Sequence, residues 1–338
     1  MLGLLGLMGA VFAGFMVDAL SSPDRDAQEA EDHTDRTGEE PAVEGTGSLL
    51  EEPEAAQAGL PKSDDVADPR DPNVTLLGGA AHDILTGNEG DDQVSGGVGN
   101  DLLGGRGGRD LISGGVGADW IHGGAGQDSL HGAAGSDDLQ GEEGDDLLAG
   151  GSGDDRLSGH AGQDHLVAGA GDDSLSGGDH DDSLRAGAGR DTVLGGYGDD
   201  LAIGGAGTDE VDGGDGCDTL WGGQPDAEDG AADFLNGGVG QDQLHLGAGD
   251  HARGGAGADA FVMQGAQSGD PVARITDYDA SEDRLVLQYD SALHDRPQVT
   301  IQSEPGSPDA TILLDGVAVA HVLGGAGLSA ADVQLQPS

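Results

Sequence analysis

The sequence is poor in basic residues and in aromatic residues. Only 13 of its 338 residues are Lys or Arg, against 65 Asp or Glu, so the formal net charge is −52. Phosphate binding needs clustered Lys and Arg, and we therefore expect no nucleic-acid partner. Phe, Trp and Tyr make up 3% of the chain while 67 residues are Gly, which argues against an ordinary enzyme core. A chain of this charge either stays unfolded or is held together by a positively charged partner.

Cysteine and the common catalytic motifs are also scarce. The only cysteine is Cys217, which excludes lipoprotein processing near the N-terminus. We interpret Cys217 as an inert exposed thiol, although an odd cysteine in a secreted protein can pair between chains. The sequence contains no H-E-x-x-H, G-x-S-x-G, P-loop or G-x-G-x-x-G motif, so we expect no enzymatic activity.

The first 73 residues differ from the rest. Residues 1–17 contain only Met, Leu, Gly, Ala, Val and Phe, a length between that of a signal-peptide apolar region and a membrane span. No basic residue precedes them, so a membrane-inserted anchor, a cleaved signal and a start-site artefact all stay open. Residues 18–73 carry 17 acids, 4 bases and half of the 12 prolines. This composition predicts a disordered acidic linker.

From Gly78 the sequence repeats every nine residues, beginning GGAAHDILT, GNEGDDQVS and GGVGNDLLG. Sixteen blocks reach Trp221 without an insertion, with Asp at position six in all sixteen, an aliphatic Leu, Ile or Val at position eight in fifteen and Gly at position four in fourteen. The pattern returns twice before residue 262. The position-six residues are Asp83, Asp92, Asp101, Asp110, Asp119, Asp128, Asp137, Asp146, Asp155, Asp164, Asp173, Asp182, Asp191, Asp200, Asp209 and Asp218, followed by Asp242 and Asp259.

This spacing predicts an all-β fold over residues 78–262, a parallel β-roll (a β-helix solenoid). One apolar residue between two variable ones forms a minimal strand with one inward side chain. The glycine-rich residues then turn the chain, because Gly reaches positive φ. Two blocks make one coil, and coils must stack because none can bury its apolar face alone. Counting two blocks per coil gives about eight to nine coils.

Stacking also places the position-six carboxylates about 4.8 Å apart along each edge of the roll. Residues 78–262 hold 32 Asp but only 5 Glu, which indicates a need for a short, stiff carboxylate beside a turn. A hard divalent cation between turns would convert the repulsion into cross-links. Calcium fits better than magnesium, which demands tight octahedral geometry, and zinc or copper would need Cys or His in the fixed columns.

The blocks resemble the G-G-x-G-x-D-x-U-x nonapeptide of RTX (hemolysin-type) calcium-binding proteins. The resemblance implies that loops of a β-roll bind Ca²⁺ through the aspartates named above and through glycine-loop carbonyls. Two columns of eight loops leave seven gaps each, which implies roughly fourteen ions. It also implies a chain that is exported unfolded and folds in a calcium-rich exterior. We expect weaker sites where Gly is replaced at position two or four, by Ala81, Asn88, Arg106, Glu142, His160 and His180.

Residues 263–338 lose the period and predict a β cap for the roll. The stretch RITDYDASEDRLVL resembles the segment after the repeats in serralysin-type RTX proteins, where the C-terminal region also carries an uncleaved signal for type I secretion. Asp315-Gly316 is a strong hairpin signal. The expected strands are 274–276, 284–288, 298–302, 311–314 and 317–323.

Taken together, we expect a non-enzymatic, secreted or surface protein that folds on binding calcium. Two other roles stay open: a calcium-rigidified adhesion or matrix spacer anchored by its N-terminus, and a non-catalytic relative of RTX exoenzymes. Cell-surface or matrix polysaccharide and the type I secretion machinery are the candidate macromolecular partners. Ile84, Leu102 and Trp120 should form an outward apolar ladder, which packs against the linker, is simply tolerated at the surface, or docks a partner.

Overall fold

The computed structural model describes residues 72–337 except 225–229 and 266–267. The apolar segment 1–17 and nearly all of the acidic linker therefore lie outside the described residues. In the part described, the regular elements are β-strands and one short 3₁₀ turn, η1 (Ala330–Asp332). This part of the chain contains no helix long and apolar enough to cross a membrane.

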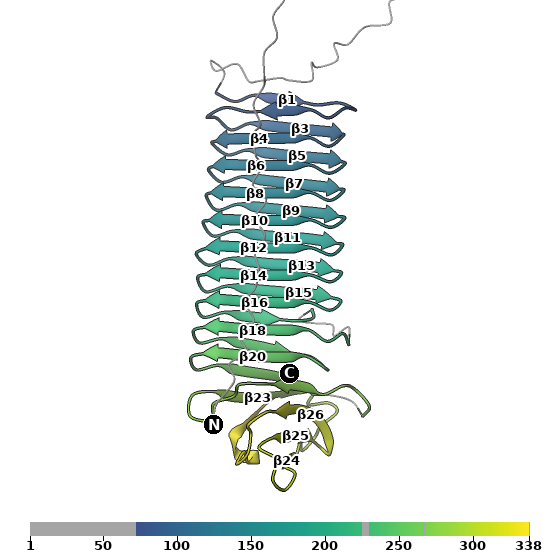
Figure 1. Ribbon diagram of the computed structural model, residues 1–338, viewed down its shortest axis with the longest axis vertical. Helices are drawn as coiled ribbons and strands as arrows, with labels where there is room; N and C mark the ends of the chain where they lie inside the picture. The colour runs from purple at the N-terminus through teal and green to yellow at the C-terminus, as the bar shows by residue number, and fades with distance from the viewer. Residues whose placement is uncertain (1–71, 225–229, 266–267, 338) are drawn as a thin grey trace, which may run out of the picture. The chain divides into compact units, whose positions relative to one another are not determined.

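The strands alternate along the chain between two sheets, as the two-block coil predicts (Figure 1). We call the 13-stranded sheet the odd sheet, and all of its strand pairs are parallel. Its strands in spatial order are β1 (Thr75–Leu77), β3 (Gln93–Val98), β5 (Leu111–Val116), β7 (Ser129–Ala134), β9 (Leu147–Ser152), β11 (His165–Ala170), β13 (Ser183–Ala188), β15 (Leu201–Ala206), β17 (Thr219–Trp221), β19 (Gln243–Leu246), β21 (Ala260–Gln264), β23 (Arg284–Tyr289) and β27 (Val333–Pro337).

We call the 14-stranded sheet the even sheet. It is parallel through eleven strands and the following β26, and it ends in an antiparallel extension. Its strands in spatial order are β2 (Ile84–Thr86), β4 (Leu102–Gly107), β6 (Trp120–Ala125), β8 (Asp138–Glu143), β10 (Arg156–Ala161), β12 (Ser174–Asp179), β14 (Thr192–Tyr197), β16 (Glu210–Asp215), β18 (Phe234–Val239), β20 (His251–Ala256), β22 (Ala273–Ile275), β26 (Val317–Val322), β25 (Ala310–Leu314) and β24 (Val299–Gln302).

Most strands are six residues long, twice the length of the expected x-U-x unit. In β4, for example, Leu103 pairs with Ile121 and, beyond the glycine at position one, Arg106 pairs with Gly124. Backbone pairing needs no side chain, so it resumes in the first positions of the next block. The glycine loop is consequently shorter than the sequence indicates, and most of each block is held by the neighbouring coils.

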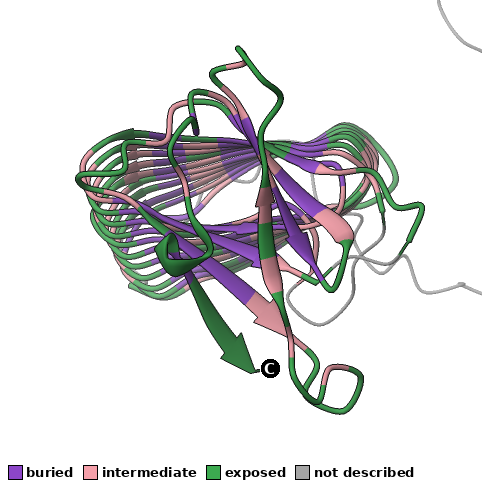
Figure 2. Ribbon diagram, turned by 90° about the horizontal axis from the view of Figure 1, so that it is seen from below, coloured by how far each residue is buried: buried purple, intermediate pink, exposed green. Residues whose placement is uncertain are grey.

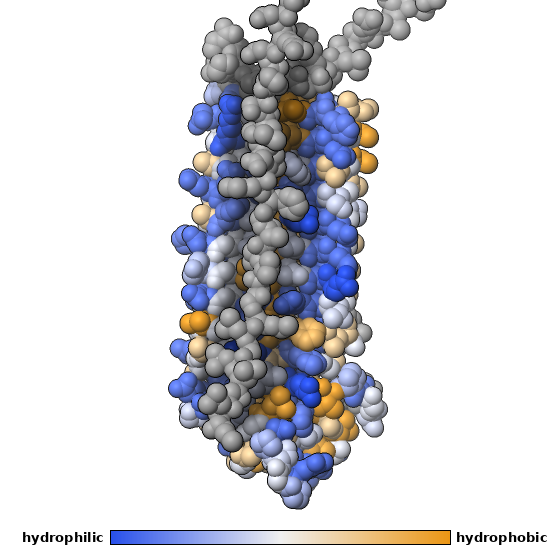
Figure 3. Space-filling view, in the orientation of Figure 1, coloured by the Kyte–Doolittle hydropathy of each residue, from blue (hydrophilic) through white to orange (hydrophobic). Residues whose placement is uncertain are grey.

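The core consists of the position-eight side chains of both sheets. Leu103, Ile112 and Ile121 are 0–1% exposed, and Ala202, the one smaller residue in this column of the sixteen blocks, is fully buried as well. Viewed along the stack, the buried residues lie mainly on the strands, whereas the turns and the C-terminal strand β27 are mostly exposed (Figure 2). The visible outer surface is mostly hydrophilic, as the net charge requires (Figure 3). One aliphatic residue per half-coil therefore suffices for a continuous core.

The stack does not end at Trp221, and the expectation of eight to nine coils was too low. The insertion before Phe234 lies between β17 and β18, while β16 still pairs with β18 and β17 with β19. The roll therefore has about ten turns. The extra residues between β17 and β18 lengthen one block without disturbing the register, since the pairing involves only the strands.

Parallel stacking also continues past residue 262 into the cap. β23 pairs in parallel with β21, and β27 pairs in parallel with β23; β27 was not expected from the sequence. The five expected cap strands are present as β22 to β26, with each end within one residue of its predicted position. The hairpin between β25 and β26 is confirmed, with Asp315 and Gly316 at φ 50° and 87°.

Candidate metal centre

The position-six aspartates form two ladders of buried carboxylates, one before the strands of each sheet. All eighteen predicted residues are at most 6% exposed. The backbone N–H of each donates to Oδ1 of the aspartate one coil further on: Asp101 to Asp119 at 2.8 Å and Asp146 to Asp164 at 2.8 Å. The structure therefore brings the predicted residues together in two columns, which we call the aspartate ladders.

The ladders contain three further members that the sequence reasoning missed. Asp209 N–H donates to Asp233 Oδ1 at 2.9 Å, and Asp233 N–H to Asp250 Oδ1 at 3.0 Å. In the other ladder, Asp259 N–H donates to Asp283 Oδ1 at 3.0 Å. Asp233 and Asp250 stand in blocks of irregular length, and Asp283 lies beyond the repeats. Each of the three nevertheless begins an Asp-x-apolar triplet: DFL, DHA and DRL. That local triplet would have found them.

The hydrogen bonding of the other carboxylate oxygen, Oδ2, differs between the ends of the ladders and their interior. At the ends it accepts a backbone N–H, as from Gly79 to Asp83 at 2.7 Å and from Gly247 to Asp250 at 2.7 Å. In the interior it is buried with no hydrogen-bond partner among the described residues. These interior residues are Asp101, Asp110, Asp119, Asp128, Asp137, Asp146, Asp155, Asp164, Asp173, Asp182, Asp191, Asp200, Asp218 and Asp242.

A buried acceptor without a donor is costly, on the order of 1–3 kcal/mol and more when charged. Several interior carboxylates show this cost as a raised pKa. Burial raises the pKa of Asp146, Asp155 and Asp182 to about 7, against the lowering effect of one backbone hydrogen bond each, and neighbouring aspartates raise it further. Each interior Oδ2 therefore needs a proton or a cation.

The missing side chain at position one keeps the space beside Oδ2 open. A Cβ on Gly141 would collide with Asp146 Oδ2 and would lie 3.0 Å from the carbonyl oxygen of Gly159, the position-one residue one coil further on. A carboxylate and main-chain carbonyls thus face one small space, and hard oxygen donors of this kind suit Ca²⁺. Ala168 and Ala186 occupy the same position in two blocks and are buried, a departure that the sequence reasoning passed over.

Side chains alone could not hold such an ion. In the ranges that the structure covers, no three His, Cys, Asp or Glu side chains converge on one point. An ion at the ladders must therefore take most of its ligands from main-chain oxygens, which is ordinary for calcium and unlike zinc. The residues present fit calcium.

The backbone at positions two and four explains the remaining glycines. Gly144, at position four, has φ 136°, a conformation essentially restricted to glycine. Where another residue replaces the glycine, as Glu142 does at position two and His180 at position four, φ is 81–82°, in the left-handed region. Ala133, at position two, is a further such residue not noted from the sequence. Weaker calcium binding at the substituted blocks stays a prediction.

We predict that the calcium-free roll gains stability in mild acid. Burial raises the pKa of Asp146 to about 7 and that of Asp191 to about 6 in the folded chain, from an ordinary value of 3.8, so the folded state binds more protons in this interval. Its stability should therefore rise as the pH falls from about 7 to about 4. Circular dichroism in EDTA at several pH values measures this: the β-sheet signal, lost at about pH 7, should increase as the pH is lowered toward about 4. A β-sheet signal in EDTA that is stronger at about pH 7 than at about pH 4 would contradict the placement of the carboxylates.

We also predict that Asp146→Asn lowers calcium binding while leaving the calcium-free protein at least as stable, because it removes a buried charge but keeps an acceptor for the ladder. Asp145→Asn is the matched control: Asp145 is exposed and accepts the backbone N–H of Gln163 at 3.0 Å outside the ladder. Isothermal titration should show one or two fewer ions for Asp146→Asn and no change for the control. Equal loss in both variants would show that general acidity, not the ladder, binds the ion.

Comparisons with known proteins agree with this geometry. The family model for the RTX calcium-binding nonapeptide repeat matches residues 75–103, 104–139, 131–166, 158–193, 194–224 and 229–250. No curated protein matches the sequence.

Among solved structures, the crystal structure of the extracellular lipase LipA from Serratia marcescens is 17% identical, with a TM-score of 0.22. The match covers 69% of this chain and 40% of the lipase chain, and at this TM-score it supports no conclusion. The family model, in contrast, matches about half of the sequence, and the matched residues include all of the ladder aspartates except Asp259 and Asp283. The chain therefore belongs to the family of RTX calcium-binding nonapeptide-repeat proteins.

Proposed function

We propose that this protein is a non-catalytic calcium-binding protein that is exported and folds outside the cell when calcium binds. The observation that carries the proposal is the row of buried interior Oδ2 atoms, which have no protein donor within the described residues. Ions that bind only the folded chain stabilise it by mass action. A chain that depends on calcium in this way stays extended where calcium is scarce and folds where it is plentiful.

The proposal places the protein outside the cell or at its surface, with export by a type I secretion system. It is supported by the resemblance of residues 274–287, RITDYDASEDRLVL, to the segment that follows the repeats in serralysin-type proteins. In the structure this segment supplies β22 and β23, the strands that join the roll to its cap. The lack of a catalytic motif supports a role in binding instead of catalysis.

Binding of many calcium ions is the direct test. Equilibrium dialysis of the full chain should give a number on the order of fourteen ions per molecule, with little competition from magnesium. Binding of only one or two ions, or equal binding of magnesium, would overturn the assignment of the ladders. Fractionation of the source cells tests the location: recovery from the medium or the cell surface supports export, and recovery of folded protein from the cytosol contradicts it.

A further inference from the structure

Two rows of side chains point outward from the even sheet, one from the first and one from the third residue of each strand from β2 to β20, and they continue at Arg274 and Thr276 of the next coil. Parallel pairing keeps each row in register, so that Glu210, Phe234 and His251 are neighbours in the first row, and Asp212, Asn236 and Arg253 in the other. Between the rows lies the backbone of the buried second residues. We call the space between the two rows the trough.

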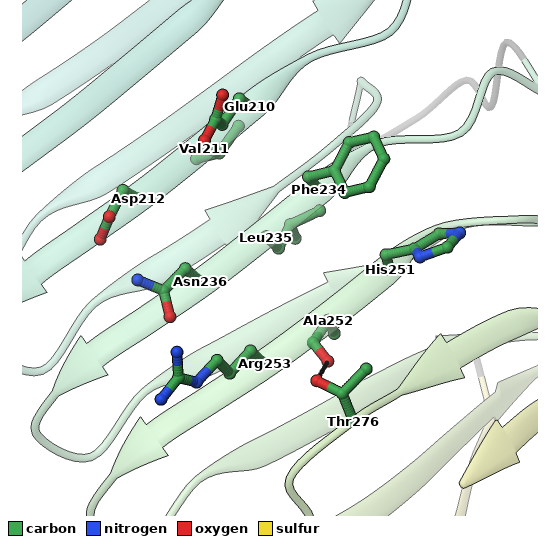
Figure 4. Close-up of a pocket in the computed structure, with 10 residues that line it drawn as sticks. All are labelled: Glu210, Val211, Asp212, Phe234, Leu235, Asn236, His251, Ala252, Arg253 and Thr276. Carbon is green, nitrogen blue, oxygen red and sulfur yellow. Dashed lines mark hydrogen bonds between the residues drawn. The ribbon is translucent and has the colours of Figure 1, made fainter. Parts of the chain in front are cut away.

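The trough deepens at β16, β18 and β20 into a hollow of about 230 Å³. Phe234 and His251 line one side, with ring centroids 4.9 Å apart and planes inclined by 39°. Asp212, Asn236 and Arg253 line the other side (Figure 4). Half of the Phe234 side chain is exposed, so its ring is available to a ligand in the hollow.

The polar side of the hollow has hydrogen-bonding capacity that the protein does not use. Neither the Asp212 carboxylate nor the Asn236 amide has a hydrogen-bond or ion-pair partner within the described part of the chain. Arg253 is oriented by Asp277, with Nε 3.4 Å from Oδ2. Planar amide, carboxylate and guanidinium groups bind pairs of hydroxyls, and an aromatic ring packs on the apolar face of a sugar ring.

The trough continues beyond this hollow. A second hollow of about 330 Å³ lies over β8, β10 and β12, and the same two rows line it with Gln140, Arg156 and Ser158. Further along the first row come Trp120, Leu102 and Ile84, which are 40–63% exposed and paired in register. This confirms that the expected apolar ladder is exposed. Sites repeated along one straight face favour an extended chain as the ligand over a single sugar.

The charge of the trough indicates which kind of extended polymer it can bind. Three carboxylates and three guanidinium groups stand in the two rows between β8 and β22, so the rows themselves are formally neutral there, although Asp277 beside Arg253 adds one negative charge at their edge, in a chain of net charge −52. A polyanion would be repelled by the rest of the molecule, and a polycation would bind better elsewhere on it. The charged residues of the trough are Asp138, Arg156, Glu210, Asp212, Arg253 and Arg274.

We propose that the trough binds a linear, uncharged polysaccharide, with the sugar ring that stacks on Phe234 held by Asp212, Asn236 and Arg253. The inference rests on the proposed function, because the two rows exist only in the folded, calcium-loaded roll. It adds a partner class and a site to that function.

Affinity electrophoresis of the full chain with millimolar calcium tests the proposal. The gels contain dextran, laminarin or hydroxyethyl cellulose as uncharged polymers and hyaluronan as a polyanion. At least one uncharged polymer should retard the protein, and Phe234→Ala or Asn236→Ala should weaken that retardation about tenfold. Tyr197→Ala is the matched control, because Tyr197 is an aromatic residue 63% exposed outside the two rows.

Circular dichroism of the same samples separates the two proposals. A wild-type protein that does not fold with calcium contradicts the proposed function and removes the trough with it. A protein that folds with calcium but is retarded by none of the uncharged polymers, or by hyaluronan alone, overturns only the present inference. Retardation that survives both Phe234→Ala and Asn236→Ala, in variants that fold with calcium, overturns it as well, since the polymer then binds elsewhere.

Discussion

Removal of calcium at neutral pH is expected to unfold the roll, with loss of its β-sheet circular dichroism signal and recovery on addition of millimolar calcium. The interior carboxylates have buried Oδ2 atoms without donors among the described residues, and burial raises the pKa of several of them, to about 7 for Asp146 and Asp182. The calcium-free roll therefore carries many partly ionised, unpaired groups in its walls. Each unpaired buried acceptor costs on the order of 1–3 kcal/mol.

The expected size of this effect follows from mass action. At a calcium concentration one hundred times its dissociation constant, one site contributes about 2.7 kcal/mol. A few such sites already match the 5–15 kcal/mol of a typical folded domain, so loss of all of them should leave no stable roll. Magnesium at the same concentration is the control for ionic strength and should not restore the fold. A protein that keeps its full β-sheet signal in excess EDTA would contradict the role given to the ladders.

Replacing one glycine at position four is expected to have the second largest effect. Gly144 has φ 136°, and a Cβ there would collide with the carbonyl oxygen of Gly126 one coil earlier. Gly144→Ala should therefore lower the unfolding free energy in calcium by about 4 kcal/mol or more, since backbone strain and a clash with a neighbouring coil add. Calcium-dependent urea unfolding measures this.

Two variants in the same block serve as controls. Glu143→Ala changes an exposed neighbour and should leave stability within about 0.5 kcal/mol. Glu142→Gly should increase stability by about 1 kcal/mol, because Glu142 has φ 81° and glycine adopts that conformation without strain. Similar losses of unfolding free energy for Gly144→Ala and Glu143→Ala would contradict this prediction, because the loss would then not depend on the positive φ of Gly144.

The repeat made the middle of the molecule predictable and left its ends uncertain. Sixteen blocks of one length fix the inward residue and the ladder aspartate by position alone, and those aspartates were found. Asp233 and Asp250 were missed because their blocks have fifteen and eight residues, so the period is lost while the local triplet survives. β27 was missed for another reason: its pairing with β23 depends on a contact between segments far apart in sequence.

The hydrogen bonds between coils join residues mostly eighteen positions apart, as from Asp101 to Asp119. Over the roughly 260 residues described, this separation corresponds to a relative contact order of about 0.07, the range of helical bundles and well below that of most β-sandwiches. The slow step of all-β folding, the search for partners distant in sequence, is therefore largely absent from the roll. We expect it to form coil by coil at a rate set by the closure of short loops, so that its folding time after a rise in calcium depends little on how many repeats the chain contains.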